Sequence, residues 1–191
     1  MVVNGISEKI ILTDCDGVLL DWCVAFNQWM AFKGYVLKNS MEYDVVNKYQ
    51  ITEPEKRKLT SEFNSSAWMG YLTPYKDAVK YVKKLHEEHG YVFHVITSLS
   101  NDKFAQKLRI SNLENIFGKN IFDDYTFLNT GSDKDQALKM WKGSECYWIE
   151  DKWDNAVQGL VFGLKSILIS DVSRNFKSEV KTWKEIYEMI T

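Results

Sequence analysis

Residues 9–21 read Lys-Ile-Ile-Leu-Thr-Asp-Cys-Asp-Gly-Val-Leu-Leu-Asp, and no other stretch constrains the fold as strongly. An apolar, β-prone run stops at two carboxylates, Asp14 and Asp16, and Gly17 follows at once. The i, i+2 spacing puts both acids on the same side of a strand, and the glycine indicates that the strand is ending. The sequence therefore predicts two acids presented together at the carboxyl end of a strand.

Two carboxylates held this close repel one another, so the pair requires a cation between them or a proton on one of them. A hard, oxygen-seeking ion such as Mg²⁺ suits this ligand set, because the chain has no Cys/His cluster that would select a softer metal. Taken alone, however, Asp-x-Asp-Gly fits a solvated turn better than a metal site. Three later stretches change that interpretation.

Composition excludes several classes of function. A chain of 191 residues is long enough for one core of ordinary size with a modest insertion. The formal net charge of -2 gives no basic field for polymeric nucleic acid, so that partner is not expected. Three cysteines without metal-site spacing favour free thiols in a reducing compartment, and Cys15 is read as a small strand residue rather than a nucleophile. With no signal-like segment and no membrane-length apolar run, we expect a cytoplasmic protein without a membrane partner.

Helical and strand patterns alternate along the rest of the chain. Helices are predicted at 22–33, 53–63, 73–88 (from Thr73-Pro74), 102–117, 155–162 and 183–190. Further strands are predicted at 91–96, 124–128, 146–151 and 165–169. Their apolar runs are mostly continuous, as expected for strands covered on both faces of a parallel sheet. We therefore expect an α/β, Rossmann-like fold in which a parallel five-stranded sheet lies between helices.

Residues 20–73 carry no strand pattern and are predicted to form a small helical cap inserted after the first strand. Residues 1–19 and 74–191 then form the core domain. The cap is rich in aromatic residues, which stack on nucleobases with about 1–3 kcal/mol per contact, so it would suit a nucleotide. Phe26, Trp68 and Tyr71 are the candidates for lining a substrate cleft, because they lie close to the hinges. The alternative is that these rings form the cap's own core.

Polar groups also follow the second predicted strand and precede a later helix. The strand at 91–96 ends in Thr97-Ser98, and hydroxyls at the tip of a parallel strand are good phosphate ligands. Ser132 and Asp135 have the spacing of a capping pair, which would place Lys134 in the first helical turn. A lysine there opposes the helix dipole unless an anion binds beside it. Taken singly, a hydroxyl after a strand and a solvated lysine are both common.

The strand at 146–151 again ends in paired acids, Glu150 and Asp151. All four stretches thus fall at the carboxyl ends of parallel strands or at a helix start that faces them. Ligands of open α/β sheets bind at that edge. We therefore expect these side chains to converge on one site.

The order of these stretches resembles the four motifs of the haloacid dehalogenase superfamily. The first motif, Asp-x-Asp-Gly-x-x-x-Asp, is matched by Asp14, Asp16, Gly17 and Asp21, and the later motifs are matched by Thr97, Lys134 and the Glu150-Asp151 pair. The resemblance implies the following roles: Asp14 as nucleophile, Asp16 as general acid and base, Thr97, Ser98 and Lys134 as phosphate ligands, and Asp14, the Asp16 carbonyl and Asp151, with Glu150 second, as ligands of Mg²⁺. Where the family often has a further Asp, this chain has Asn155, with Asp154 one place earlier, so the last ligand stays open.

The insertion after the first motif resembles a C1 cap of that superfamily. Residues 72–78 and the Thr97-Ser98-Leu99 tip are similar to the 5′(3′)-deoxyribonucleotidase branch. The resemblance implies a Mg²⁺-dependent phosphomonoester hydrolase acting through an aspartyl-phosphate on (deoxy)nucleoside monophosphates. Two alternatives are a phosphatase of sugar phosphates or other small metabolites and a catalytically silent binding protein. The expected partner is a small phosphomonoester, with a homodimer as the candidate assembly.

Overall fold

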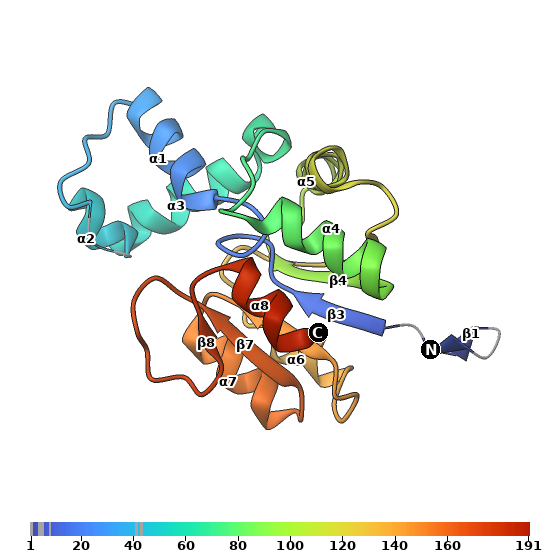
Figure 1. The fold of residues 1–191 in the computed structure, drawn as a ribbon. Coiled ribbons are helices and arrows are strands. Elements are labelled where there is room, and N and C mark those ends of the chain that lie inside the picture. The colour runs from blue at the N-terminus through green and yellow to red at the C-terminus, as the bar shows by residue number, and fades with distance from the viewer. Residues whose placement is uncertain (1, 4–5, 8, 41, 43) are drawn as a thin grey trace.

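A computed structural model describes residues 2–3, 6–7, 9–40, 42 and 44–191 of the chain. It contains a six-stranded sheet in the order β5-β4-β3-β6-β7-β8, whose neighbouring strands run parallel. The strands of this sheet are β3 (Lys9–Thr13), β4 (Tyr91–Ser98), β5 (Phe122–Leu128), β6 (Tyr147–Glu150), β7 (Lys165–Ile169) and β8 (Glu179–Val180). A separate antiparallel pair, β1 (Val2–Val3) and β2 (Ile6–Ser7), precedes it (Figure 1).

The parallel α/β sheet is confirmed, but the prediction of five strands was wrong. The sixth strand, β8, consists of two residues that pair with β7 through Ile169 and Val180. Two residues cannot show an apolar run or an alternation, so the sequence holds no periodic signal for this strand. The β1–β2 pair escaped prediction for the same reason.

Helices cover both faces of the sheet, and successive residues of β3 serve opposite layers. Ile11 packs in the cluster shared with α4 (Ala78–His89), α5 (Lys103–Phe117) and α8 (Trp183–Ile190). Its neighbour Leu12 packs in the cluster with α6 (Asp135–Lys139), and α7 (Trp153–Val161) contacts β6 and β7 (Figure 1). Burial on both faces explains why the strand reads as a continuous apolar run.

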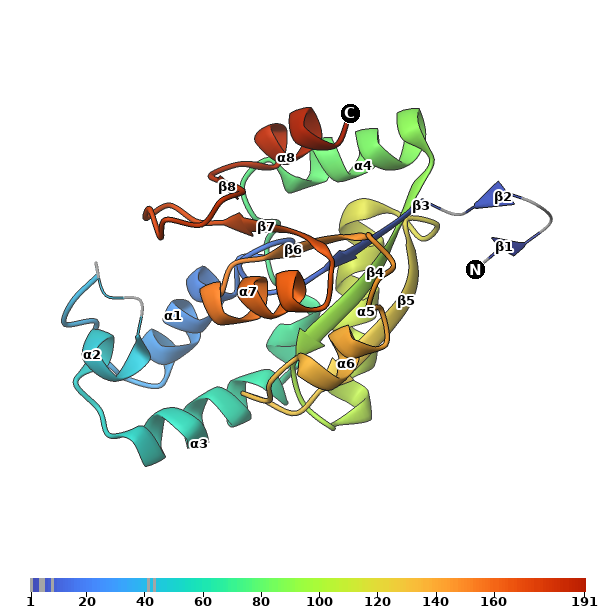
Figure 2. The same ribbon diagram turned by 90° about the horizontal axis from the view of Figure 1, so that it is seen from below.

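Residues 22–70 form a helical insertion between β3 and β4. It comprises α1 (Trp22–Phe32), α2 (Val45–Tyr49), α3 (Glu53–Asn64) and the short 3₁₀ helix η1 (Ala67–Gly70). Figures 1 and 2 show α1, α2 and α3 grouped beyond one end of the sheet. Asp21, the last acid of the first motif, caps α1 by accepting a hydrogen bond from Val24 N, and Thr52 forms a capping box with Glu55. The division into a core and a 20–73 cap stays a prediction.

The helix predicted from Thr73-Pro74 begins later, at Ala78. Pro74 forms an isolated antiparallel bridge with Leu20, and the Thr73 carbonyl accepts a hydrogen bond of 2.9 Å from Asp21 N. Lys76 has a φ of 42°, which a right-handed helix does not allow. Extended pairing between the two connections of the insertion therefore replaces the first turn that proline at N1 would favour.

The other predicted helices are present with boundary shifts of a few residues. The largest shift is in α7, which begins at Trp153 rather than at Asn155. Within the described ranges, none of the helices combines the length and the apolarity that crossing a bilayer requires.

Candidate active site

A pocket of about 310 Å³ lies at the carboxyl ends of the central strands and is lined by both the sheet and the helical insertion. The structure brings together here the seven polar residues to which the resemblance gives catalytic, phosphate-binding or metal-binding roles. They are Asp14, Asp16, Thr97, Ser98, Lys134, Glu150 and Asp151. Residues from three different strand ends thus converge, as the topology of a parallel sheet requires.

Asp14 follows β3 directly and is anchored by its backbone, because Asp14 N donates to Ile149 O on the neighbouring β6 at 2.9 Å. Its Oδ1 accepts a hydrogen bond of 2.7 Å from Cys15 N, and its Oδ2 lies 2.6 Å from Lys134 Nζ. Burial raises the pKa of Asp14 to about 7, against the opposing effect of Lys134. The Asp14 carboxylate is therefore held by a backbone N–H at one oxygen and by a fixed cation at the other.

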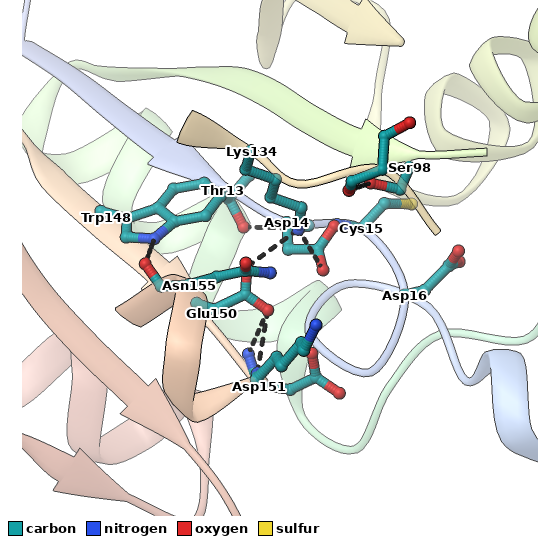
Figure 3. A network of polar contacts seen from close by, with 12 residues as sticks. Thr13, Asp14, Cys15, Asp16, Ser98, Lys134, Trp148, Glu150, Asp151 and Asn155 are labelled. Atoms are coloured by element: carbon teal, nitrogen blue, oxygen red, sulfur yellow. Dashed lines mark hydrogen bonds and ion pairs between the residues drawn. The ribbon is translucent and has the colours of Figure 1, made fainter. Parts of the chain in front are cut away.

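Lys134 is the N-cap residue of α6, whereas the sequence analysis predicted it in the first turn of that helix. The predicted capping pair of Ser132 and Asp135 does not form, since the structure has no side-chain cap at this helix start. Burial lowers the pKa of Lys134, but Asp14 and Glu150 outweigh it and raise that pKa above its usual range. The ammonium lies 2.8 Å from Glu150 Oε2 and 5.2 Å from the centre of the Trp148 ring. Lys134 is thus a buried, permanently charged group held between two carboxylates (Figure 3).

Glu150 is fully buried, and both of its carboxylate oxygens are occupied. Oε1 accepts hydrogen bonds from the backbone N–H groups of Asp151 and Lys152, at 3.0 and 2.9 Å. Oε2 accepts from Lys134 Nζ and from Asn155 Nδ2, the latter at 3.2 Å. Four donors fill the acceptor positions of a carboxylate. This arrangement suits a group that positions Lys134 better than a group that ligates a metal.

Three carboxylates nevertheless lie close enough together to hold one cation. Oxygens of Asp14, Glu150 and Asp151 all lie within 4.8 Å of one another. Burial, and after it the charges of Glu150 and Asp14, raise the pKa of Asp151 well above its usual range. An all-oxygen cluster of this kind fits Mg²⁺, and Asp14 and Asp151 are the members best placed to serve as its ligands.

Gly17 allows this cluster to form. Its φ is 75°, and a Cβ at this position would collide with Oδ2 of Asp151. Only glycine therefore permits the first-motif loop to approach the β6 tip this closely.

Thr97 and Ser98 end β4 on the opposite side of the pocket from the acidic tip of β6. Ser98 Oγ donates to Ser132 O at 2.8 Å, which ties this tip to the loop before α6. The Thr97 hydroxyl is buried and has no hydrogen-bond partner among the described residues. A buried hydroxyl without a partner is costly, so one that faces a pocket is well suited to a ligand oxygen.

Asp16 lies on the loop after β3, and its side chain points away from the Asp14 carboxylate in Figure 3. Its Oδ1 lies 2.5 Å from Nη1 of Arg109 on α5, and that arginine is fully buried. Sequence reasoning missed Arg109, because a single arginine in a helix 93 residues away carries no motif signal.

Cys15, between the two acids, is buried, and burial raises the pKa of its thiol to about 12, which excludes a thiolate nucleophile.

The helical insertion supplies the outer wall of the pocket. Phe26 is among the lining residues, but it is only 1% exposed and belongs to the main hydrophobic core, and its ring stacks on that of Trp22 at 4.5 Å between centroids. Trp22 Nε1 donates to Asn64 Oδ1 at 2.8 Å, and Asn64 in turn donates to Leu99 O, which ties the insertion to the tip of β4. Trp22 and Asn64, like Phe26, line the pocket, but neither stood out in the sequence as a site residue.

The structure does not bring the other two cleft candidates into this pocket. Trp68 packs against the main hydrophobic core, with its ring 6.3 Å from that of Phe63. Tyr71 is 79% exposed and follows η1 on the way back to the sheet. Proximity to a hinge in the sequence was an insufficient guide, because the 3₁₀ turn directs these rings elsewhere.

No protein-family model matches the chain. Among curated proteins, it is similar to an uncharacterised 32.4 kDa protein encoded in the Gp30–rIII intergenic region of Enterobacteria phage T4, with 29% identity over 148 residues. The match covers 73% of this chain and 51% of the phage protein, so the chain spans about half the length of the curated relative it matches.

Solved structures resemble this chain over nearly its whole length. The haloacid dehalogenase-like family hydrolase SP0104 from Streptococcus pneumoniae has a TM-score of 0.66 and 13% identity, over 96% of this chain and 99% of that one. YfnB from Bacillus subtilis, solved bound to magnesium, has a TM-score of 0.61 and 14% identity, over 97% and 100%. CbbY from Rhodobacter sphaeroides, solved in complex with phosphate, has a TM-score of 0.58 and 16% identity, over 94% and 96%. At these identities the likeness establishes the fold, which is that of haloacid dehalogenase-like hydrolases.

Proposed function

We propose that this chain, built on the haloacid dehalogenase fold, is a Mg²⁺-dependent phosphomonoester hydrolase in which Asp14 is the nucleophile. The observation that carries the proposal is the pairing of Asp14 with Lys134 in a pocket that also contains the unpartnered hydroxyl of Thr97. A carboxylate, a fixed cation and a free hydroxyl donor are the groups that an incoming phosphoryl group requires.

The reaction begins with attack of an Asp14 oxygen on phosphorus, which forms an acyl phosphate on Asp14 and breaks the bond to the leaving oxygen. Lys134 stays within hydrogen-bond distance of Asp14 and offers positive charge to the phosphoryl oxygens. Thr97 Oγ1 donates to one of those oxygens, with Ser98 beside it. These groups hold the phosphoryl group in position before any bond forms or breaks.

Asp16 is the proposed acid and base of the two half-reactions. It protonates the leaving oxygen in the first step and takes a proton from water in the second, when water attacks phosphorus and releases Asp14. Arg109 holds the Asp16 carboxylate on the pocket wall in this structure. Proton transfer then involves rotation of the Asp16 side chain from Arg109 toward the phosphoryl group.

Asp14 and Asp151, with the Asp16 carbonyl, are the proposed ligands of Mg²⁺, and Glu150 serves to position Lys134. A divalent cation bound there would neutralise charge on the phosphoryl oxygens. The pKa values of Asp14 and Asp151 are raised first by burial and then by the neighbouring acids, and a bound cation would relieve the repulsion between these acids.

The proposed substrates are nucleotides. The support is the partly exposed ring of Trp22, which lines the same pocket as Asp14 and stacks on the buried ring of Phe26. Aromatic side chains can take a nucleobase without great selectivity for its identity.

Phosphate release from a panel of nucleoside monophosphates and sugar phosphates, with Mg²⁺ and with EDTA, tests the proposal. We expect Mg²⁺-dependent release that is greatest with nucleotides and is abolished in Asp14→Asn. Asp123→Asn, at an exposed position on β5, is the matched control and should retain activity. Release by Asp14→Asn at the wild-type rate would exclude the mechanism, and release from sugar phosphates alone would exclude the nucleotide.

A further inference from the structure

The outer wall of the pocket contains a buried lysine that the proposed reaction does not use. Lys48 lies on α2 and lines the pocket with only 8% of its surface exposed. Its backbone is fixed by three hydrogen bonds: its N–H donates to Asp44 O at 2.9 Å, and its carbonyl accepts from Lys38 N and Asn39 N. The side chain is therefore presented from a well-anchored position.

Lys48 has no carboxylate partner among the residues that the structure describes. Two other lysines of the pocket lining do have such partners: Lys134 lies between Asp14 and Glu150, and Lys56 lies 2.6 Å from Asp44. Lys48 therefore places a positive charge in the pocket lining that no carboxylate of the described residues neutralises. An anionic group of a ligand could pair with it there.

The surroundings of Lys48 indicate where such a ligand group would lie. Phe26 and Trp22 supply an apolar wall, and Asn27, also in the lining, is held by the hydroxyl of Tyr49 at 2.8 Å. These residues all belong to the insertion, whereas Asp14 belongs to the sheet. When the reacting phosphoryl group lies at Asp14, Lys48 is available to bind the leaving portion of the substrate.

We infer that the substrate carries a second anionic group, a phosphate or a carboxylate on its leaving portion, and that Lys48 binds this group. The inference rests on the proposed function and narrows its substrate class. For a nucleotide, it favours a nucleoside 3′,5′-bisphosphate over the corresponding monophosphate.

Matched substrate pairs test the inference. The pairs are adenosine 3′,5′-bisphosphate with adenosine 5′-monophosphate, for a second phosphate, and 3-phosphoglycerate with glycerol 3-phosphate, for a carboxylate. The measurement, for each pair, is kcat/KM of the compound with the second anionic group divided by kcat/KM of the compound without it. Because a hydrogen bond to a charged group is among the stronger ones, Lys48→Met should lower this ratio by about 10- to 100-fold for the preferred pair. Whichever pair shows the loss identifies the anion.

Two further variants separate charge from structure. Lys48→Arg keeps the positive charge and should retain most of the preference. Lys58→Met removes a charge from a lysine of the same insertion whose side chain is 76% exposed, and it should leave the ratio at the wild-type value. If Lys48→Met and Lys58→Met give the same ratio in both pairs, Lys48 does not bind a second anion, even though the phosphatase itself is active.

Binding distinguishes failure of this inference from failure of the proposed function. Calorimetric titration of Asp14→Asn, alone and combined with Lys48→Met, measures affinity for the same four compounds without turnover. Tighter binding of the doubly anionic member that disappears with Lys48→Met supports the inference even if no compound is hydrolysed. Equal affinities within both pairs in the Asp14→Asn parent would overturn it.

Discussion

Replacing Glu150 by glutamine tests whether this residue positions Lys134 or ligates a metal. The side-chain amide of the introduced glutamine can take two orientations, and in each of them its NH₂ group faces hydrogen-bond donors. In one, the NH₂ faces the backbone N–H groups of Asp151 and Lys152, and in the other it faces Lys134 Nζ and Asn155 Nδ2. Either way two donors lose their acceptor in a fully buried position, and Lys134 loses one of its two negative partners.

The expected cost is large. Removing one partner of a buried ion pair costs about 3–5 kcal/mol. For a chain of this size, each kcal/mol shifts Tm by about 2–4 °C, so Tm should fall by roughly 6–20 °C. Urea and thermal unfolding followed by circular dichroism, in EDTA, measure this free energy. Glu188→Gln is the matched control, because Glu188 is exposed and lies 3.6 Å from Lys184, and its effect should be within about 0.5 kcal/mol.

The sign of the change in the free energy of unfolding decides whether Glu150 positions Lys134 or only ligates a metal. If Glu150 were only a metal ligand crowded against Asp14 and Asp151, neutralising it without metal would relieve repulsion and stabilise the fold. A Glu150→Gln protein in EDTA that is as stable as wild type, or more so, would refute the role of Glu150 in positioning Lys134.

Three other perturbations follow from the geometry of the pocket. Thr97→Val removes a buried hydroxyl without a partner, so Tm should hold or rise while KM for the phosphomonoester rises by about 10-fold; a clear fall in Tm would show that the hydroxyl is satisfied within the fold. Arg109→Met deprives Asp16 of its partner at 2.5 Å and should lower kcat by about 10-fold or more, with a smaller change in KM, whereas the exposed Arg57→Met should leave both unchanged. An equal loss in both arginine variants would count against a specific role of Arg109. Burial raises the pKa of Asp14 from 3.8 to about 7, so the folded protein binds a proton at Asp14 more tightly than the unfolded chain does. This stabilises the fold in full below about pH 4, and the stabilisation is lost as the pH rises through about 7. Mg²⁺ binds the ionised carboxylates, so it should raise Tm more at about pH 8 than at about pH 5.5, and an equal rise at both would contradict the assigned ligands.

The strand ends could be predicted because their signals are local. A buried parallel strand gives a continuous apolar run, and the polar residues that follow it, such as Asp14, Thr97 and Asp151, fall at one edge of the sheet whatever the details of packing. Lys134 was placed near the correct helix start for the same reason. Its exact cap position was not predicted, because the 132–135 spacing imitates a capping pair that the structure does not form.

The residues that the sequence did not reveal belong to helices distant from the strand ends. Arg109 is a single cation within a predicted helix, and Lys48 is a single cation in a stretch for which no helix was predicted; a solvent-exposed side chain is the ordinary outcome for both. Their burial against Asp16 and in the pocket depends on how α5 and the insertion pack on the sheet, which no local pattern encodes. The same holds for Tyr71, whose position near a hinge predicted a cleft residue but whose side chain is exposed.

Trapping the covalent intermediate on Asp14 tests the central claim most directly. Wild-type protein mixed with Mg²⁺ and a phosphomonoester that it hydrolyses is quenched in acid during turnover and analysed by mass spectrometry, with and without hydroxylamine. We predict one added phosphoryl group on the peptide that contains Asp14, lost on treatment with hydroxylamine and absent from Asp14→Asn. Phosphate release by the wild type with no phosphoryl group on this peptide, or with the group on another residue, would contradict the proposed mechanism.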